Sequence, residues 1–170
     1  MRETLSLLLA LLWHEAGHLA AAKLCGTPLR SFELRFPGAA FTFDFSRAGY
    51  LREAAVHFGG PAAGLLAAWA AAAWFGGRAS FFIGASLAAA LVNLLPIEGF
   101  DGGGIVRCLL ERFLPPDFAW RIGRAISVLA VLLLWAAVLW AELRLGANLS
   151  LLLFLTAVML SVIPAKKNGG

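Results

Sequence analysis

Three residues near the start of the chain have the types and the spacing of a zinc site. They are His14, Glu15 and His18, within the stretch LLWHEAGHLAAA at residues 11–22. Residues four apart lie on one face of a helix, so the two imidazoles can bind one ion. Glu15 lies about 100° round the helix axis from His14 and can reach a water at that ion. The pattern predicts two zinc ligands and a general base.

A third ligand is needed, because a catalytic zinc takes three protein ligands and a water. The stretch NLLPIEGFDGGG, residues 93–104, ends an apolar segment and carries Asp101 among glycines that allow a tight turn. Asp101 is therefore the predicted third ligand. Two alternatives stay open: Glu98 could be the carboxylate ligand instead, or Asp101 could be an ordinary loop aspartate.

The composition of the whole chain is that of an integral membrane protein. Of its 170 residues, 61% are hydrophobic and 14% are charged, whereas soluble domains have about half and about a quarter. A chain this short and this apolar cannot hide its apolar surface in one water-soluble core. The histidine motif thus lies where ionisable groups are costly and are by default functional, although polar residues that face a water-filled crevice are the alternative. Cys25 and Cys108 form neither a zinc-finger spacing nor a disulfide framework.

Five apolar segments each have about the 20 residues that cross a bilayer. They are residues 4–25, 54–75, 80–97, 122–143 and 147–164. Residues 29–50 instead alternate apolar and polar side chains around a Pro-Gly pair, which predicts a β-hairpin. Residues 102–121 predict a short amphipathic helix closed by a Pro-Pro pair. The expected fold is an α-helical polytopic membrane protein with about five transmembrane helices and a small cytoplasmic β-hairpin.

The basic residues predict the orientation in the membrane. With five spans, 11 Lys and Arg residues fall on the side that holds the loops after the first and third spans and the C-terminal tail. Three fall on the other side. Cytoplasmic loops collect Lys and Arg, so the N-terminus is expected outside the cytoplasm and the C-terminus inside it. This topology explains the net charge of +4, and no nucleic-acid partner is expected.

The pairing of HEAGH with a later NLLPIEGFDGG resembles the site-2 protease family of intramembrane zinc metalloproteases. It is similar in particular to the compact branch that includes the bacterial sporulation intramembrane protease. GGPAAG, at residues 59–64, resembles the Gly-Pro element of that family, and the three motifs come in the family's order. The resemblance implies His14, His18 and Asp101 as zinc ligands and Glu15 as the catalytic base.

The resemblance also implies residues that meet the substrate. Asn93 would assist near the substrate or the transition state. Gly60 and Pro61 would contact the substrate, although the spacing of Gly60 and Gly64 also favours close helix packing. His57, beside this element, could line or gate the site, or it could be structural. Gly64 stands where the family often has Asn, so one polar contact is expected to be missing.

The implied function is that of a hydrolase that holds one Zn²⁺ per chain. It would cut transmembrane segments of membrane-tethered proteins near the cytoplasmic face, in regulated intramembrane proteolysis. Its expected partners are membrane lipids, single-span proteins or transcription factor precursors as substrates, and a regulatory membrane partner or a second copy of the chain. One peptidase domain is expected over residues 1–170, with a catalytic core over about 1–104 and two further spans over 122–164, in a bacterial cell membrane. The alternative is a catalytically silent relative that acts as a binding scaffold.

Overall fold

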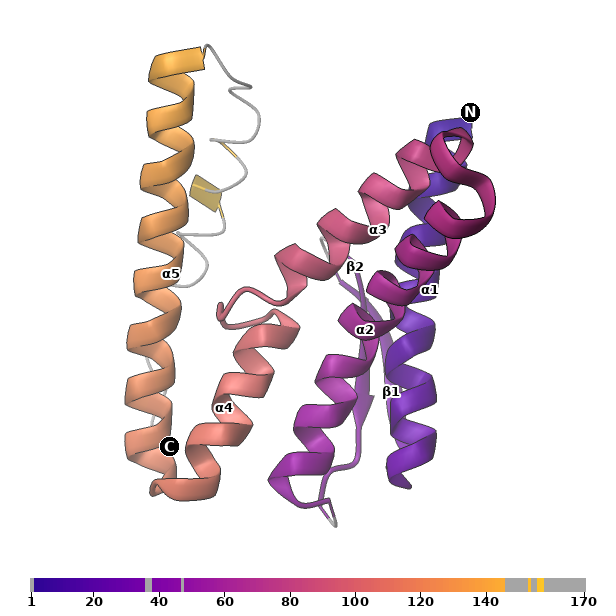
Figure 1. Ribbon diagram of the computed structural model, residues 1–170. Coiled ribbons are helices and arrows are strands. Elements are labelled where there is room, and N and C mark those ends of the chain that lie inside the picture. The colour runs from indigo at the N-terminus through magenta and orange to yellow at the C-terminus, as the bar shows by residue number, and fades with distance from the viewer. Residues whose placement is uncertain (1, 36–37, 47, 146–152, 154–155, 158–170) are drawn as a thin grey trace.

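The computed structural model describes residues 2–35, 38–46, 48–145, 153 and 156–157 of the chain. The elements are α1 Arg2–Cys25, β1 Leu29–Arg35, β2 Gly38–Phe43, α2 Tyr50–Phe75, the 3₁₀ helix η1 Gly76–Ala79, α3 Ser80–Asn93, α4 Asp101–Phe113 and α5 Pro116–Leu145. Helices α1, α2 and α3 pack together on one side of the molecule, and α4 lies between α2 and α5 in contact with both (Figure 1). This arrangement brings the beginning of α4 to the middle of the molecule.

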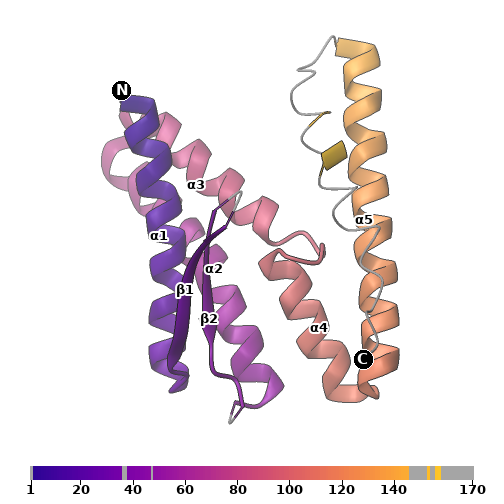
Figure 2. The same ribbon diagram turned by 180° about the vertical axis from the view of Figure 1, so that it is seen from behind.

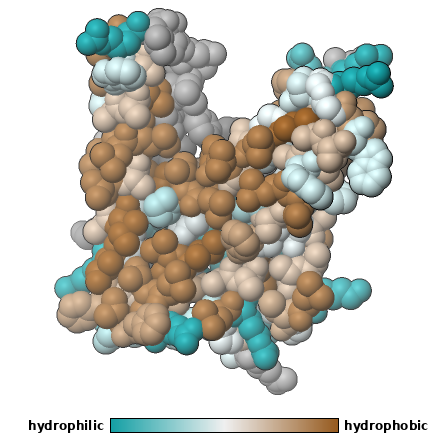
Figure 3. All heavy atoms as spheres, viewed as in Figure 1, coloured by the Kyte–Doolittle hydropathy of each residue, from teal (hydrophilic) through white to brown (hydrophobic). Residues whose placement is uncertain are grey.

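Three helical stretches of the described chain are long and apolar enough to cross a membrane. They are Arg2–Cys25, Tyr50–Asn93 and Pro116–Arg144. Large apolar side chains point outward on them, such as Trp69 with 72% and Leu133 with 62% of its surface exposed. Figure 3 shows hydrophobic residues across the middle of one face and hydrophilic residues at its ends. Contiguous apolar surface of this extent marks contact with lipid, so the chain is an integral membrane protein.

The expected number of five spans is not confirmed. The segments predicted at 4–25, 54–75 and 122–143 lie within α1, α2 and α5. The third is shorter than predicted, because α3 has only 14 residues, about 21 Å of helix against about 30 Å of hydrocarbon. The fifth, at 147–164, lies outside the described residues except for 153, 156 and 157.

Small residues allow the first three helices to approach closely. A Cβ on Gly59 of α2 would fall 2.6 Å from the Ala21 Cβ of α1. About one turn further along α2, a Cβ on Gly64 would lie 3.4 Å from the Ala90 Cβ of α3. The η1 turn sends α3 back along α2, which is why residues on both sides of the turn meet (Figure 1). Such close contact stabilises helix pairs in lipid, where the hydrophobic effect between helices is absent.

A two-stranded antiparallel sheet follows α1, which confirms the predicted β-hairpin. Strand β1 pairs with β2, with Leu29 opposite Phe43 at the open end. Phe43 is buried against Ala22 of α1 and Val56 of α2. Figure 2 shows the hairpin lying beside α1. The sheet is therefore anchored to both helices at the end where β2 leads into α2.

The loop between α3 and α4 has the glycine turn that the sequence predicts. Gly99 adopts φ +95°, which glycine tolerates because it has no Cβ. Ile97 is buried with Val131 of α5. The Glu98 N–H donates to the Ser127 Oγ of α5 at 2.8 Å. Contacts to α5 thus fix the loop immediately before Asp101.

The predicted amphipathic helix does close at the Pro-Pro pair, but the predicted range 102–121 runs too far. Helix α4 begins at Asp101 and ends at Phe113, and α5 already begins at Pro116. The prolines therefore separate two helices, and residues 116–121 belong to α5 and not to the predicted helix 102–121. The reason is that proline is favoured in the first turn of a helix, where its missing N–H leaves no hydrogen bond unmade.

Candidate metal centre

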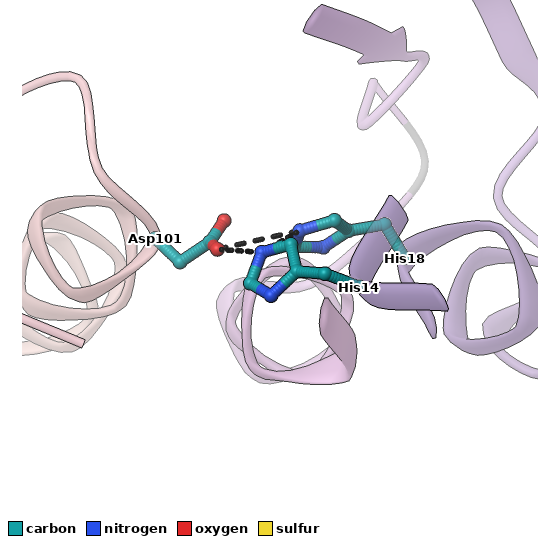
Figure 4. Close-up of side chains that lie close together, drawn as sticks. All are labelled: His14, His18 and Asp101. Carbon is teal, nitrogen blue, oxygen red and sulfur yellow. Dashed lines mark hydrogen bonds and ion pairs between the residues drawn. The ribbon is translucent and has the colours of Figure 1, made fainter. Parts of the chain in front are cut away.

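Three side chains from two helices converge on one point inside the protein. His14 and His18 lie one turn apart on α1, and Asp101 is the first residue of α4 (Figure 4). Asp101 Oδ2 lies 3.1 Å from His14 Nε2 and 3.3 Å from His18 Nε2. The two Nε2 atoms are 3.3 Å apart. Ligand atoms of a tetrahedral zinc with bonds of about 2.0–2.1 Å lie about 3.3–3.4 Å apart, so the three atoms fit three corners of such a site.

The surroundings of the three ligands suit a cation. His14 and His18 are 3% and 8% exposed, so a bound ion would be shielded from bulk water. Asp101 offers a carboxylate oxygen at the same point, and a carboxyl group binds a metal in its deprotonated form. Within the described chain, these three residues are the His, Cys, Asp and Glu group that could hold a metal ion.

Contacts behind the histidines decide which ring nitrogen faces the metal position. His18 Nδ1 donates to the Val56 carbonyl at 2.8 Å. Because a carbonyl only accepts, Nδ1 carries the proton and Nε2 keeps the lone pair that binds a metal. His14 Nδ1 is buried without a hydrogen-bond partner among the described residues. A Cβ on Gly64 would lie 3.9 Å from that nitrogen. The glycine that stands where the resembled family often has Asn is therefore directly beside a ligand.

Gly60 forms the wall behind the two imidazoles. A Cβ at this position would fall 2.7 Å from His14 Nε2 and closer still to His18 Nε2. Any side chain at residue 60 would therefore occupy the space of the ligand atoms. Pro61 is buried inside α2. Gly60 thus packs against both ligand histidines, while the substrate contact implied for Gly60 and Pro61 stays a prediction.

A cavity of about 450 Å³ adjoins the metal centre, and Glu15 lies in its wall together with His18 and Asp101. Phe43 and Phe45, at the end of the hairpin, line the same cavity. A volume of this size is typical of a ligand pocket. The predicted base and two of the predicted ligands thus share one space with apolar side chains.

Residues of α5 complete the cavity, and no motif or spacing in the sequence indicates this. Trp120 and Arg124 belong to its lining, and the Arg124 guanidinium lies over the Trp120 ring at 5.3 Å. These two residues are more than 100 positions from the histidine motif. Only the pairing of α5 with α4 brings them to the site.

The other three candidate site residues, Asn93, Glu98 and His57, do not belong to the group of three ligands. The Asn93 side-chain amide donates to the Ala89 carbonyl of its own helix at 2.9 Å, and Asn93 is not among the described residues that line the cavity. Glu98 is an exposed residue in the cavity lining and does not belong to the metal group. His57 also lines the cavity. The structure thus brings Asp101 rather than Glu98 to the two histidines.

Comparisons with known proteins agree with this geometry. The family model of Peptidase M50B-like proteins matches residues 4–111, which include the histidine motif and Asp101. The chain is similar in fold to the Site-2 Protease from Methanocaldococcus jannaschii, with a TM-score of 0.64 and 19% sequence identity. The similarity covers 93% of this chain and 74% of that chain. No curated protein sequence matches this chain.

Proposed function

This chain belongs to the site-2 protease family, as a Peptidase M50B-like protein, and we propose that it is an intramembrane zinc metalloendopeptidase. The observation that carries the proposal is the convergence of His14, His18 and Asp101 beside Glu15. Two imidazoles, one carboxylate and a nearby second carboxylate are the groups that metal-assisted peptide hydrolysis needs.

The reaction would proceed by addition of water to a peptide carbonyl. When bound, zinc supplies a Lewis acid and lowers the pKa of a water molecule. His14 and His18 would hold it through their Nε2 atoms, and Asp101 through a carboxylate oxygen. Glu15 takes one proton from the attacking water as the new C–O bond forms. It then passes that proton to the nitrogen of the leaving amine as the C–N bond breaks.

The substrate would be a transmembrane segment of another protein. A helical peptide bond is shielded by its own hydrogen bonds, so the segment must unwind before Glu15 and the metal can act on it. Phe43 and Phe45 line the cavity and would contact the apolar side chains of such a segment. Unwound backbone has unpaired N–H and C=O groups, and an edge of the hairpin would pair with them as an added strand. Single-span proteins and transcription factor precursors are the substrate classes that we propose.

The orientation in a bacterial cell membrane is part of the proposal. The distribution of Lys and Arg supports an N-terminus outside the cytoplasm and a cytoplasmic C-terminus. Cleavage would then take place near the cytoplasmic face and release the cytoplasmic part of the substrate. A regulatory membrane partner or a second copy of the chain would control access to the cavity.

The second function that we considered is a scaffold that binds membrane proteins without cutting them. A scaffold needs the cavity but neither the zinc ligands nor Glu15. The grouping of His14, His18 and Asp101 beside a cavity that Glu15 also lines favours the enzyme.

Co-expression with tagged single-span membrane proteins tests the proposed function. We expect a shorter tagged fragment with the wild-type chain and none with Glu15→Gln, which lacks the base. Glu3→Gln is the matched control, because Glu3 lies on the same helix and is exposed. Equal fragment yield from wild type and Glu15→Gln would contradict the proposed mechanism. Co-purification of these proteins without any fragment would favour the scaffold.

A further inference from the structure

The two oxygens of the Asp101 carboxylate have different surroundings. Oδ2 is the atom that faces both ligand histidines. Oδ1 faces His57, whose Nδ1 lies 3.5 Å away, at the outer limit of a hydrogen bond. The carboxylate therefore points one oxygen at the metal position and the other at α2.

Residues on both α4 and the hairpin hold the His57 ring in place. A Cβ on Gly104, one turn after Asp101, would fall 2.6 Å from His57 Nε2 and 2.8 Å from its Cδ2. The ring thus lies directly against the backbone of the first turn of α4. The Phe45 ring centroid is 6.2 Å from that of His57, with 32° between the two planes. The imidazole has little room to leave this position.

Neither ring nitrogen of His57 is available to a substrate. Nδ1 faces Asp101, and Nε2 is buried without a hydrogen-bond partner among the described residues. The side chain as a whole is 27% exposed, so part of the ring borders the cavity without offering it a polar atom. This geometry does not suit a residue that binds substrate by a hydrogen bond.

One turn of α2 touches every ligand of the metal centre. The Val56 carbonyl accepts from His18, the His57 imidazole faces Asp101, and Gly60 lies against both histidines. His14 and His18 are fixed to each other by α1, but Asp101 comes from a different helix behind a loop with a glycine turn. A direct contact between Asp101 and α2 therefore bears on how the carboxylate lies relative to the histidines.

We propose that His57 is a positioning residue that donates its Nδ1–H to Asp101 Oδ1 and so directs Oδ2 to the metal. The proposal rests on the proposed zinc site and assigns to His57 a task other than substrate contact. Carboxylate ligands of metals are themselves held by hydrogen bonds, and loss of such a partner lowers metal affinity or activity about 10- to 100-fold. The same contact would join the first turn of α4 to α2.

Zinc affinity, measured on the purified full-length chain by competition with a chelator, tests this role. We expect His57→Leu, which keeps much of the volume but has no donor, to bind zinc about 10- to 100-fold more weakly than wild type. His57→Asn should stay within a few-fold of wild type, because its amide N–H can donate from about the position of Nδ1. Rescue by Asn but not by Leu separates a donor from a residue that only fills space.

A second variant displaces the ring without removing it. Gly104→Ala places a Cβ on the His57 ring and should weaken zinc binding as His57→Leu does, even if the latter folds poorly. Gly123→Ala is the matched control, since its Cβ would make an ordinary 3.6 Å contact with Leu110. Unchanged zinc affinity in His57→Leu and Gly104→Ala, with a raised KM for cleavage, would overturn the inference and restore a substrate role. Failure of the wild-type chain to bind zinc would instead overturn the proposed function.

Discussion

Gly60 lies where the two ligand histidines of α1 meet α2, and its lack of a side chain makes room for them. Gly60→Ala would place a methyl group within 2.7 Å of His14 Nε2. We predict that this variant binds zinc at least about tenfold more weakly and loses most cleavage, because the imidazoles must turn away from the metal position. Bound zinc per chain, measured by elemental analysis after dialysis against a weak chelator, checks this.

Gly84→Ala provides the control for this prediction. Gly84 lies on α3, and a Cβ there would meet no atom within 4 Å, so this variant should keep its zinc. Alanine is favoured over glycine in a helix interior by about 1 kcal/mol, so Gly84→Ala should not lose stability. Normal zinc content in Gly60→Ala would show that the histidines do not bind metal in the arrangement described.

The sequence predicted the residues of the metal centre better than their supports. His14 and His18 could be paired because helical spacing depends only on positions along the chain. Asp101 could be proposed because it follows the end of an apolar segment and lies among glycines, but the choice between Asp101 and Glu98 stayed open, since it depends on how the loop folds. The Val56 carbonyl and the His57 contact could not be predicted, because they depend on where α2 crosses α1 and meets α4. The crossing is set by side-chain packing between helices, which leaves no regular spacing in the sequence.

At the level of elements, periodicity predicted the helices and the hairpin correctly, because their hydrogen bonds join residues that are near one another in the sequence. The apolar runs of α1, α2 and α5 and the alternation of the hairpin were recognisable for this reason. The ends of elements were less predictable. Helix α3 ends at Asn93, three residues before a proline, because a residue that precedes proline is disfavoured in the helical conformation. The apolar residues that follow Asn93 extended the predicted span beyond the helix.

The hairpin carries the prediction that concerns substrate binding. Successive N–H groups of a strand point to opposite edges, so those of Ala39 and Thr42 in β2 face opposite edges. The outer edge of β2 is the edge that faces away from β1. One of the variants Ala39→Pro and Thr42→Pro therefore leaves the bonds to β1 intact and removes a donor only from this outer edge. We predict that this variant, recognised by normal zinc content and thermal stability, loses most cleavage of a membrane substrate.

Asp44 is unsuitable for this test, because its N–H already donates to the Pro28 carbonyl within the hairpin base. Thr42→Val and Ala39→Val serve as controls, since they change the side chain and keep the backbone donor. Normal cleavage by the proline variant that retains zinc and stability would show that the substrate does not pair with the outer edge of β2.

On the scale of the whole molecule, the predicted orientation in the membrane places the two ends of the molecule on opposite faces. The turn around Arg78 and the turn after Phe113 lie at opposite ends of the molecule (Figure 1). We predict that a membrane-impermeant thiol reagent added to intact cells labels Arg78→Cys and spares Phe113→Cys until the membrane is opened. Phe113 is 75% exposed, so protection of its cysteine would reflect the membrane and not the protein. The reverse pattern would place the metal centre toward the opposite face.

The two natural cysteines must not obscure this measurement. Cys108 is buried, and burial together with the nearby Glu53 carboxylate raises its pKa to about 12, so its thiol reacts slowly. Cys25 is half-buried and should be replaced by serine in both variants. With Cys25→Ser alone, no labelling from either side is expected.

In the proposed site, one zinc ion is held by two histidines of α1 and Asp101 of α4, with Glu15 as base and not as ligand. The most direct test is the number of zinc ions per chain in purified wild type, Asp101→Ala, Glu98→Ala and Glu15→Gln. We predict about one zinc in wild type, Glu98→Ala and Glu15→Gln, and a marked loss in Asp101→Ala, because zinc affinity needs all three protein ligands. Full zinc in Asp101→Ala together with loss in Glu98→Ala would show that Glu98, and not Asp101, is the third ligand.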